Sequence, residues 1–194
     1  MNVTKDKISS VFFQYSIPSV LGMLAISSAS IVDGFFIGNY VGDFGLAAIN
    51  ITFPIFSLLF GFALMLAIGS SVTAGKLIGE GDIKTASMIF SKAIVCITFF
   101  SFITSTILFL NIETILHLFG ADENLTKMAI EYLSIMLIFI PFLMIGVVLD
   151  YFVRVDNRPN LAFIALLSSG VINVVLDWFM IVYLQKGIFG AALA

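Results

Sequence analysis

The sequence predicts an all-α membrane protein, a bundle of about five transmembrane helices followed by the start of a sixth. Of its 194 residues, 60% are hydrophobic and 11% are charged, and the mean hydropathy is +1.14. A soluble domain carries about 25% charged residues, because its surface must be solvated. The charges are clustered, and between them lie apolar stretches of the roughly 20 residues that a helix needs to cross a bilayer. These stretches lack the period-two alternation that is typical of membrane barrel strands.

Charged residues mark the gaps between the predicted spans. None occurs, for example, between Lys7 and Asp33 or between Lys92 and Glu113. Proceeding in this way along residues 1–194, which we take as one domain, we expect a sixth helix to begin near residue 187 and the sequence to stop inside it. The five full spans are predicted at residues 11–37, 45–75, 86–110, 126–151 and 160–184.

The basic residues predict the orientation of the bundle, because loops on the cytoplasmic side carry an excess of Lys and Arg. With the N-terminus inside, the inner segments hold seven basic residues and the outer segments two. We therefore expect a multi-pass protein of a bacterial cell membrane with a cytoplasmic N-terminus, outer loops near residues 38–44 and 111–125, and an inner loop near residues 152–159. The inner residues are Lys5, Lys7, Lys76, Lys84, Lys92, Arg154 and Arg158, and the outer ones are Lys127 and Lys186.

Three prolines fall inside predicted spans: Pro18, Pro54 and Pro141. A proline removes a backbone donor and tends to kink a helix, and in a membrane this is tolerated where a neighbouring helix or a cavity satisfies the freed carbonyl. Two interpretations of these prolines remain open: they are ordinary prolines of membrane helices, or they mark bends that move. Small residues in the first two spans predict close helix packing; they are Gly22, Ala25 and Ala29, then Gly61, Ala63 and Ala67.

Residue types that carry catalysis are scarce. His117 is the only histidine and Cys96 the only cysteine, so no metal-ligand cluster is predicted. The glycine-rich segment 75–82 lacks the spacing of a phosphate-binding loop and indicates a tight inner turn. The nine Lys and Arg residues form no basic stripe, which argues against nucleic acid as a partner. We therefore expect neither an enzyme nor a bound cofactor.

Two acids inside the apolar runs are the strongest candidates for chemistry. Asp33 and Asp177 would lie about 6 Å and about 10 Å below the outer ends of their helices. A buried acid costs about 2.5–3.5 kcal/mol on insertion scales and usually faces a cavity or a partner. Asn173, one helical turn before Asp177, could add an amide ligand. The alternative is a pair of interfacial acids beside Trp178 and Tyr183, which resemble an aromatic belt.

Five segments, in order along the chain, carry a further pattern: Pro18 with residues 31–42, residues 75–82, residues 154–159, the trio Gly170, Asn173 and Asp177, and residues 187–194. Together they resemble the MATE (multidrug and toxic compound extrusion) transporters over the whole chain. Asp156 stands where a glycine is common in that family.

The resemblance implies twelve helices in two lobes, alternating access, and export of amphipathic cationic drugs coupled to inward H⁺ or Na⁺ flow. This chain would be the N-terminal lobe, partnered by a C-terminal lobe and the lipid bilayer. Carried over by position, Asp33, Asn173 and Asp177 would couple the cation and Pro18 would bend the first helix. Asp150, at the inner end of the fourth span, is a further candidate for coupling, although solvation at the interface explains it equally well.

Two other interpretations remain open. A lipid-linked oligosaccharide flippase of the same superfamily would share the layout, but it would tend to line its cavity with cationic residues that hold pyrophosphate. The predicted spans carry no Arg or Lys near their centres, which favours cationic cargo. A non-transporting membrane scaffold would instead leave Asp33 and Asp177 freely replaceable.

Overall fold

The computed structural model describes residues 8–194, and all regular structure in that range is helical. Five of the helices are long and apolar enough to cross a membrane, which confirms the predicted number of full spans. The elements are α1 (Ile8–Tyr40), α2 (Asp43–Gly79), α3 (Ile83–Leu110), α4 (Ile112–Leu118), α5 (Glu123–Val155), α6 (Pro159–Asp177), the π-helical segment η1 (Trp178–Tyr183) and α7 (Gly187–Leu193).

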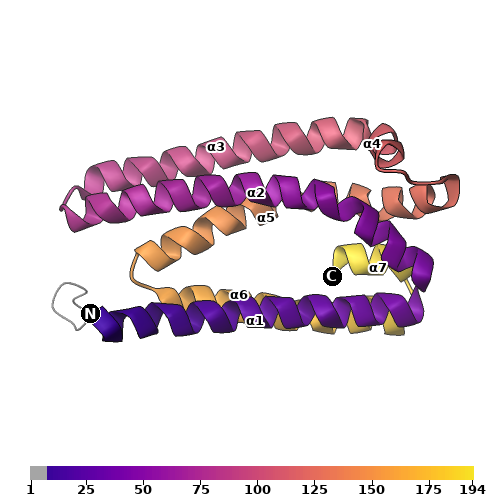
Figure 1. Ribbon diagram of the computed structural model, residues 1–194, viewed down its shortest axis with the longest axis horizontal. Helices are drawn as coiled ribbons and strands as arrows, with labels where there is room; N and C mark the ends of the chain where they lie inside the picture. The colour runs from indigo at the N-terminus through magenta and orange to yellow at the C-terminus, as the bar shows by residue number, and fades with distance from the viewer. Residues whose placement is uncertain (1–7) are drawn as a thin grey trace.

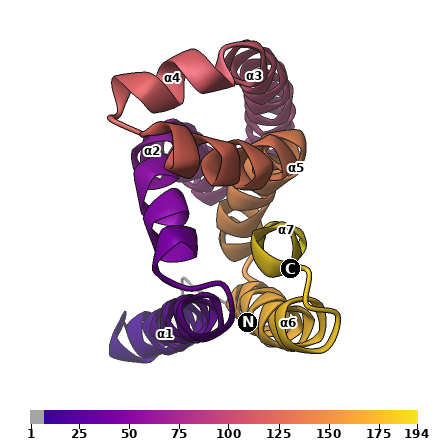
Figure 2. The same ribbon diagram turned by 90° about the vertical axis from the view of Figure 1, so that its right-hand side faces the viewer.

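The long helices form two layers joined by α5 (Figure 1). One layer is α1 beside α6, and the other is α2 beside α3, while α5 runs obliquely from the second layer to the first (Figures 1 and 2). The start of α1, the α2–α3 turn and the α5–α6 turn lie together at one end, which we call the N-terminal end. The α1–α2 turn, α4 and α7 lie at the opposite end (Figure 1).

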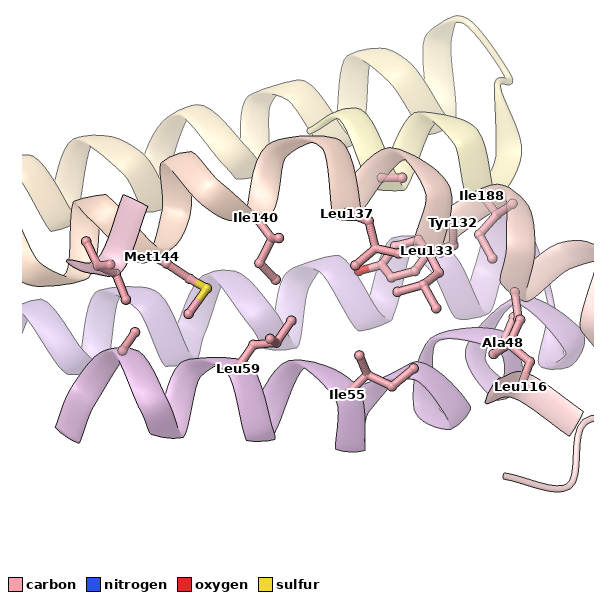
Figure 3. Packing of buried hydrophobic residues seen from close by; sticks show 14 of the residues in the cluster. Ala48, Ile55, Leu59, Leu116, Tyr132, Leu133, Leu137, Ile140, Met144 and Ile188 are labelled. Carbon is pink, nitrogen blue, oxygen red and sulfur yellow. The ribbon is translucent and has the colours of Figure 1, made fainter. Parts of the chain in front are cut away.

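The core lies between α2 and α5. Ile55 and Leu59 of α2 face Leu137, Ile140 and Met144 of α5 (Figure 3), and all five side chains are buried. Because lipid tails are as apolar as these side chains, close packing rather than removal from water holds such helices together. The core therefore depends on the shape fit between α2 and α5.

A seam of small residues joins α1 to α6. A Cβ atom added to Gly22 would lie 2.9 Å from Cδ1 of Leu166, and one added to Gly170 would lie 3.4 Å from the backbone oxygen of Ala25. Ala29 is buried in the same seam, with its Cβ 3.6 Å from that position. The small residues predicted to pack closely in the first span thus let two helix backbones approach each other.

The seam predicts that Gly170→Leu destabilises the protein by about 1–3 kcal/mol, because a Cβ at this position already touches Ala25 and Ala29 of α1 and leaves no room for the rest of the leucine side chain. Thermal unfolding of the purified protein in detergent measures the effect as a lower midpoint. The close packing predicted for the second span is wrong for Gly61, which is exposed, although Ala63 and Ala67 are buried. Gly61→Leu is therefore the matched control, since a Cβ there meets nothing within 4 Å and leucine favours the helix. Equal midpoints for the two variants would contradict the account of the seam.

All three prolines lie within continuous helices. Pro141 cannot bond the carbonyl of Leu137, four residues earlier, and the hydroxyl of Ser105 on α3 donates to that oxygen instead. A neighbouring helix thus satisfies the freed carbonyl, as the sequence predicts for a proline in a membrane span.

The turns at the N-terminal end follow from local chemistry. Gly81 has a φ of +88°, and Asp82 caps α3 by accepting a hydrogen bond from the backbone N–H of Thr85 at 3.0 Å. Hydrogen bonding to Thr85 holds the pKa of Asp82 below its usual range. In the α5–α6 turn the left-handed residue is Asn157, with a φ of +59°, directly after Asp156.

Two elements differ from expectation. Residues 111–125 were predicted as a loop, and α4 occupies part of it, because Leu116 is fully buried and pins this short helix against α5. The end of the fifth span was predicted as ordinary helix, but residues 178–183 form a π-helical segment.

Candidate functional site: a buried carboxyl pair

Asp177 is the last residue of α6 and has no exposed surface. Neither of its carboxyl oxygens has a hydrogen-bond partner among the described residues. A buried charge without a partner costs several kcal/mol, and a proton or a cation bound to this carboxyl group would remove that cost. Its environment is therefore suited to binding a positive species.

Asp33 reaches the same region from α1. It is half-buried, and its Oδ1 atom is buried without a hydrogen-bond partner in the described part of the chain. The two carboxyl groups lie close enough to interact electrostatically. The packing of α1 against α6 thus brings together two acids that are 144 positions apart in the sequence.

Asn173 lies one turn before Asp177 in α6 and is half-buried. Residues four apart share a helical face, so its amide is on the side of the helix that carries Asp177. An amide oxygen can accept a hydrogen bond or coordinate a hard cation such as Na⁺. Asn173 is therefore a candidate for a further oxygen ligand on the face of α6 that carries Asp177.

Tyr132 of α5 is a member of this region that sequence reasoning missed. Its side chain is 8% exposed, packs edge-on to Phe56 with ring centroids 6.3 Å apart, and lies within electrostatic range of both Asp33 and Asp177. A buried tyrosine usually finds a partner for its hydroxyl. A phenol at the start of an apolar run, one residue after Glu131, was the signal that could have found it.

The segment η1 begins immediately after Asp177. Its wider turn buries Ile181 while Trp178, Phe179 and Tyr183 remain partly exposed, with the rings of Trp178 and Tyr183 stacked at 6.3 Å. Short π-helical segments are rare and frequently occur at functional sites. Stacked aromatic rings at a helix end are also typical of an aromatic belt at the membrane interface. The π-helical segment and the aromatic residues predicted as a belt therefore occur at the same helix end.

The structure separates the remaining sequence candidates from the carboxyl pair. Asp150 lies near the N-terminal end, where it forms an ion pair with Arg154. Pro18 is half-buried in the first half of α1, on the same side of the molecule. Within residues 8–194, no group of three or more His, Cys, Asp or Glu side chains could hold a metal ion.

The site can therefore hold a small positive species. Two carboxyl groups from different helices, with an amide and a phenol nearby, offer oxygen ligands to a proton or to a hard monovalent cation. A multi-pass helical bundle with unpaired acids inside its spans has the general features of a membrane transporter.

Comparison with known proteins places the chain more closely. The family model described as MatE matches residues 18–179, and the chain belongs to that family, the MATE transporters. It is 30% identical over 188 residues to the multidrug export protein MepA of Staphylococcus saprophyticus, covering 95% of this chain and 42% of that protein. MepA of Staphylococcus haemolyticus is 28% identical over 189 residues, with 97% of this chain and 42% of that protein covered.

Solved structures agree in fold. A crystal structure of MATE in complex with MaD3S superposes with a TM-score of 0.87 at 25% identity, covering 92% of this chain and 40% of that one. A crystal structure of MATE in the bent conformation gives a TM-score of 0.84 at 25% identity, covering 93% and 40%. The chain thus spans about two-fifths of the length of these relatives, which agrees with the expectation that it corresponds to one lobe.

Proposed function

We propose that this chain is the N-terminal lobe of a multidrug exporter that carries amphipathic organic cations outward in exchange for H⁺ or Na⁺. The observation that supports the proposal best is the buried carboxyl pair, Asp33 and Asp177, contributed by two helices and lacking hydrogen-bond partners in the described chain for three of its oxygens. The relatives named as multidrug export proteins support the drug cargo.

In the proposed cycle the carboxyl pair alternates between a state that binds the cationic cargo and a state that binds the coupling ion. Cationic cargo is attracted while the acids are charged, and an incoming proton or sodium ion then neutralises them and weakens the attraction. Tyr132 and Asn173 serve as additional hydrogen-bonding or ligating groups. A related MATE protein has been solved in straight and bent conformations, and we propose that α1 bends here at Pro18.

The proposed exporter needs a second lobe. Transporters built from repeated halves bind cargo at the interface between the halves, and a single lobe supplies one wall of such a cavity. We use the term full-length transporter for this chain joined to its C-terminal lobe.

A flippase for lipid-linked oligosaccharide is the second candidate function. A MOP superfamily transporter from Pyrococcus furiosus, whose structure is described as having a binding pocket of reversed polarity, superposes equally well, with a TM-score of 0.87. The shared fold therefore does not by itself determine the cargo. The acidic carboxyl pair favours cationic cargo over pyrophosphate, which would be repelled.

Efflux from proteoliposomes tests the proposal. The full-length transporter is expected to move ethidium against an imposed H⁺ or Na⁺ gradient and to stop when the gradient is collapsed. Movement that is indifferent to both gradients, or transport of a pyrophosphate-linked lipid in place of ethidium, would contradict ion-coupled drug export.

The proposed orientation places the N-terminal end in the cytoplasm. Cysteines are introduced in a background with Cys96 replaced, at the exposed positions Asn39 and Asn124 of the opposite end and at Glu80 of the N-terminal end. An impermeant maleimide added to intact cells is expected to label Asn39→Cys and Asn124→Cys, and to label Glu80→Cys only after permeabilisation. The reverse pattern would invert the topology.

A further inference from the structure

A partly buried ion pair at the N-terminal end reaches across to α1. Arg154 of α5 binds the carboxylate of Asp150 through two hydrogen bonds, from Nε to Oδ2 at 3.0 Å and from Nη2 to Oδ1 at 3.1 Å. The two side chains are only 18% and 20% exposed. The remaining guanidinium nitrogen, Nη1, donates to the hydroxyl of Ser19 on α1 at 2.5 Å. The ion pair is thus satisfied within α5 and still holds α1.

A second hydrogen bond ties the same turn of α1 to the α5–α6 turn. The hydroxyl of Tyr15 donates to Oδ1 of Asn157 at 2.6 Å. Asn157 has a φ of +59°, a backbone conformation that asparagine tolerates better than most residues. Ser19 also donates its own hydroxyl hydrogen to the backbone oxygen of Tyr15 at 2.7 Å. The two links are therefore joined to each other on one face of α1.

These links lie on either side of Pro18. Tyr15 precedes the proline by three residues, and Ser19 follows it directly. A proline leaves the helix without one of its backbone hydrogen bonds, so this is the weakest turn of α1. Asp33 lies fifteen residues further along the same helix, about 22 Å away. A small change of direction at Pro18 therefore becomes a large displacement of Asp33.

We infer that Tyr15, Ser19, Arg154 and Asn157 form a polar clasp that holds the turn of α1 containing Pro18 against α5 and the α5–α6 turn, so that the rest of α1 moves about this fixed turn. The inference rests on the proposed function, and these four are positioning residues, since none of them reaches the carboxyl pair. Asp150 belongs to the clasp as the group that orients Arg154. Without the clasp the Pro18 turn itself shifts relative to α5, and a bend there no longer gives Asp33 a defined displacement.

The test removes both links without disturbing the ion pair. Tyr15→Phe combined with Ser19→Ala deletes two hydroxyl groups and leaves Arg154 bound to Asp150. Spin labels at the exposed positions Ile17 and Leu149, with Cys96 replaced, report the distance between the Pro18 turn of α1 and α5. The parent full-length transporter is expected to give one narrow distance distribution, and the double variant a broad one.

Export is measured on the same proteins. Loss of two hydrogen bonds is expected to lower the maximal rate of ethidium export at least about fivefold, while the ethidium concentration at half-maximal rate is unchanged, because the carboxyl pair is intact. The single variant Ser19→Thr keeps both hydroxyl groups of the clasp and should export at the parental rate. The control, Ser30→Ala with Tyr40→Phe, removes the same atoms from exposed positions of the same helix and should change neither measurement.

The two measurements separate the possible failures. An unchanged distance distribution would show that the clasp does not hold α1, and a broad distribution with parental export would show that holding α1 does not matter for transport; either result overturns the inference. A parent protein that exports nothing would contradict the proposed function, and the distance distributions would then still decide whether the clasp fixes the Pro18 turn of α1.

Discussion

Ion-coupled export of ethidium is expected to fall to the level of empty liposomes when Asp177 of the full-length transporter is replaced by asparagine. The amide keeps the shape of the carboxyl group and part of its hydrogen bonding, but it cannot carry the charge that alternates through the proposed cycle. Replacing the acid by a neutral amide also removes the cost of a charge in the membrane. Expression should therefore hold steady or rise while transport is lost.

Companion variants separate this account from its competitors. Asp33→Asn should behave like Asp177→Asn, and the double variant should be no worse than the more damaged single variant, since both acids serve one site. Asn173→Ala should weaken coupling less severely. Asp43→Asn is the matched control, because Asp43 is an exposed acid at the same end of the bundle. If the protein is a scaffold, all variants should behave like the parent. If the acids are interfacial anchors, the variants should show a topology defect. Parental efflux in both single variants would contradict the coupling proposal.

The spans could be predicted from the sequence because their cause is local. A bilayer excludes charge over a fixed thickness, so each gap in the charge pattern corresponds to a helix. The tight turn predicted for the glycine-rich residues 75–82 is present but shorter, because α2 continues to Gly79 and only residues 80–82 form the turn, with Gly81 in a left-handed conformation that few other residues adopt. Local patterns thus give the number, order and approximate ends of the long helices.

The composition of the site was only partly predictable, because it depends on which helices pack together. An acid inside an apolar run stands out by its insertion cost, and this identified Asp33 and Asp177. Tyr132 did not stand out, because a tyrosine is tolerated at many depths in a membrane, and only the packing of α5 places it near both acids.

Long-range polar contacts were beyond the sequence for the same reason. From the sequence, solvation and coupling explained Asp150 equally well. The structure shows that Asp150 pairs with Arg154, and that Arg154 also contacts Ser19, which lies 135 positions before Arg154 in the sequence. The π-helical segment after Asp177 has no compositional signature in residues 178–183, since its six residues are all compatible with an ordinary helix. Each of these features depends on a choice of neighbour rather than on local pattern.

The lobe should nevertheless fold without its partner. Its core between α2, α3 and α5 is closed within the chain, with Ile97, Leu137 and Met144 fully buried, and α1 packs along α6 through the small-residue seam. Circular dichroism and a monodisperse elution profile of the purified 194-residue chain are expected to show a folded helical protein. This measurement is the control for the prediction that follows, because it separates a missing lobe from a misfolded one.

Cells that produce only residues 1–194 are expected to be no more resistant to ethidium than cells with an empty vector, whereas adding the C-terminal lobe on a second chain should restore resistance. Alternating access needs two bodies that rock about a site between them, and the carboxyl pair here lies in the α1–α6 layer with Asp33 and Asn173 only half-buried. One lobe can therefore bind a cation without enclosing the cargo or exposing it alternately to the two sides. Growth inhibition by ethidium, at matched membrane levels of the chain, measures the difference. Resistance from the single lobe would contradict the proposal. It would show either that this chain is self-sufficient or that it completes its cavity with a second copy of itself. Crosslinking in the membrane would distinguish these two cases.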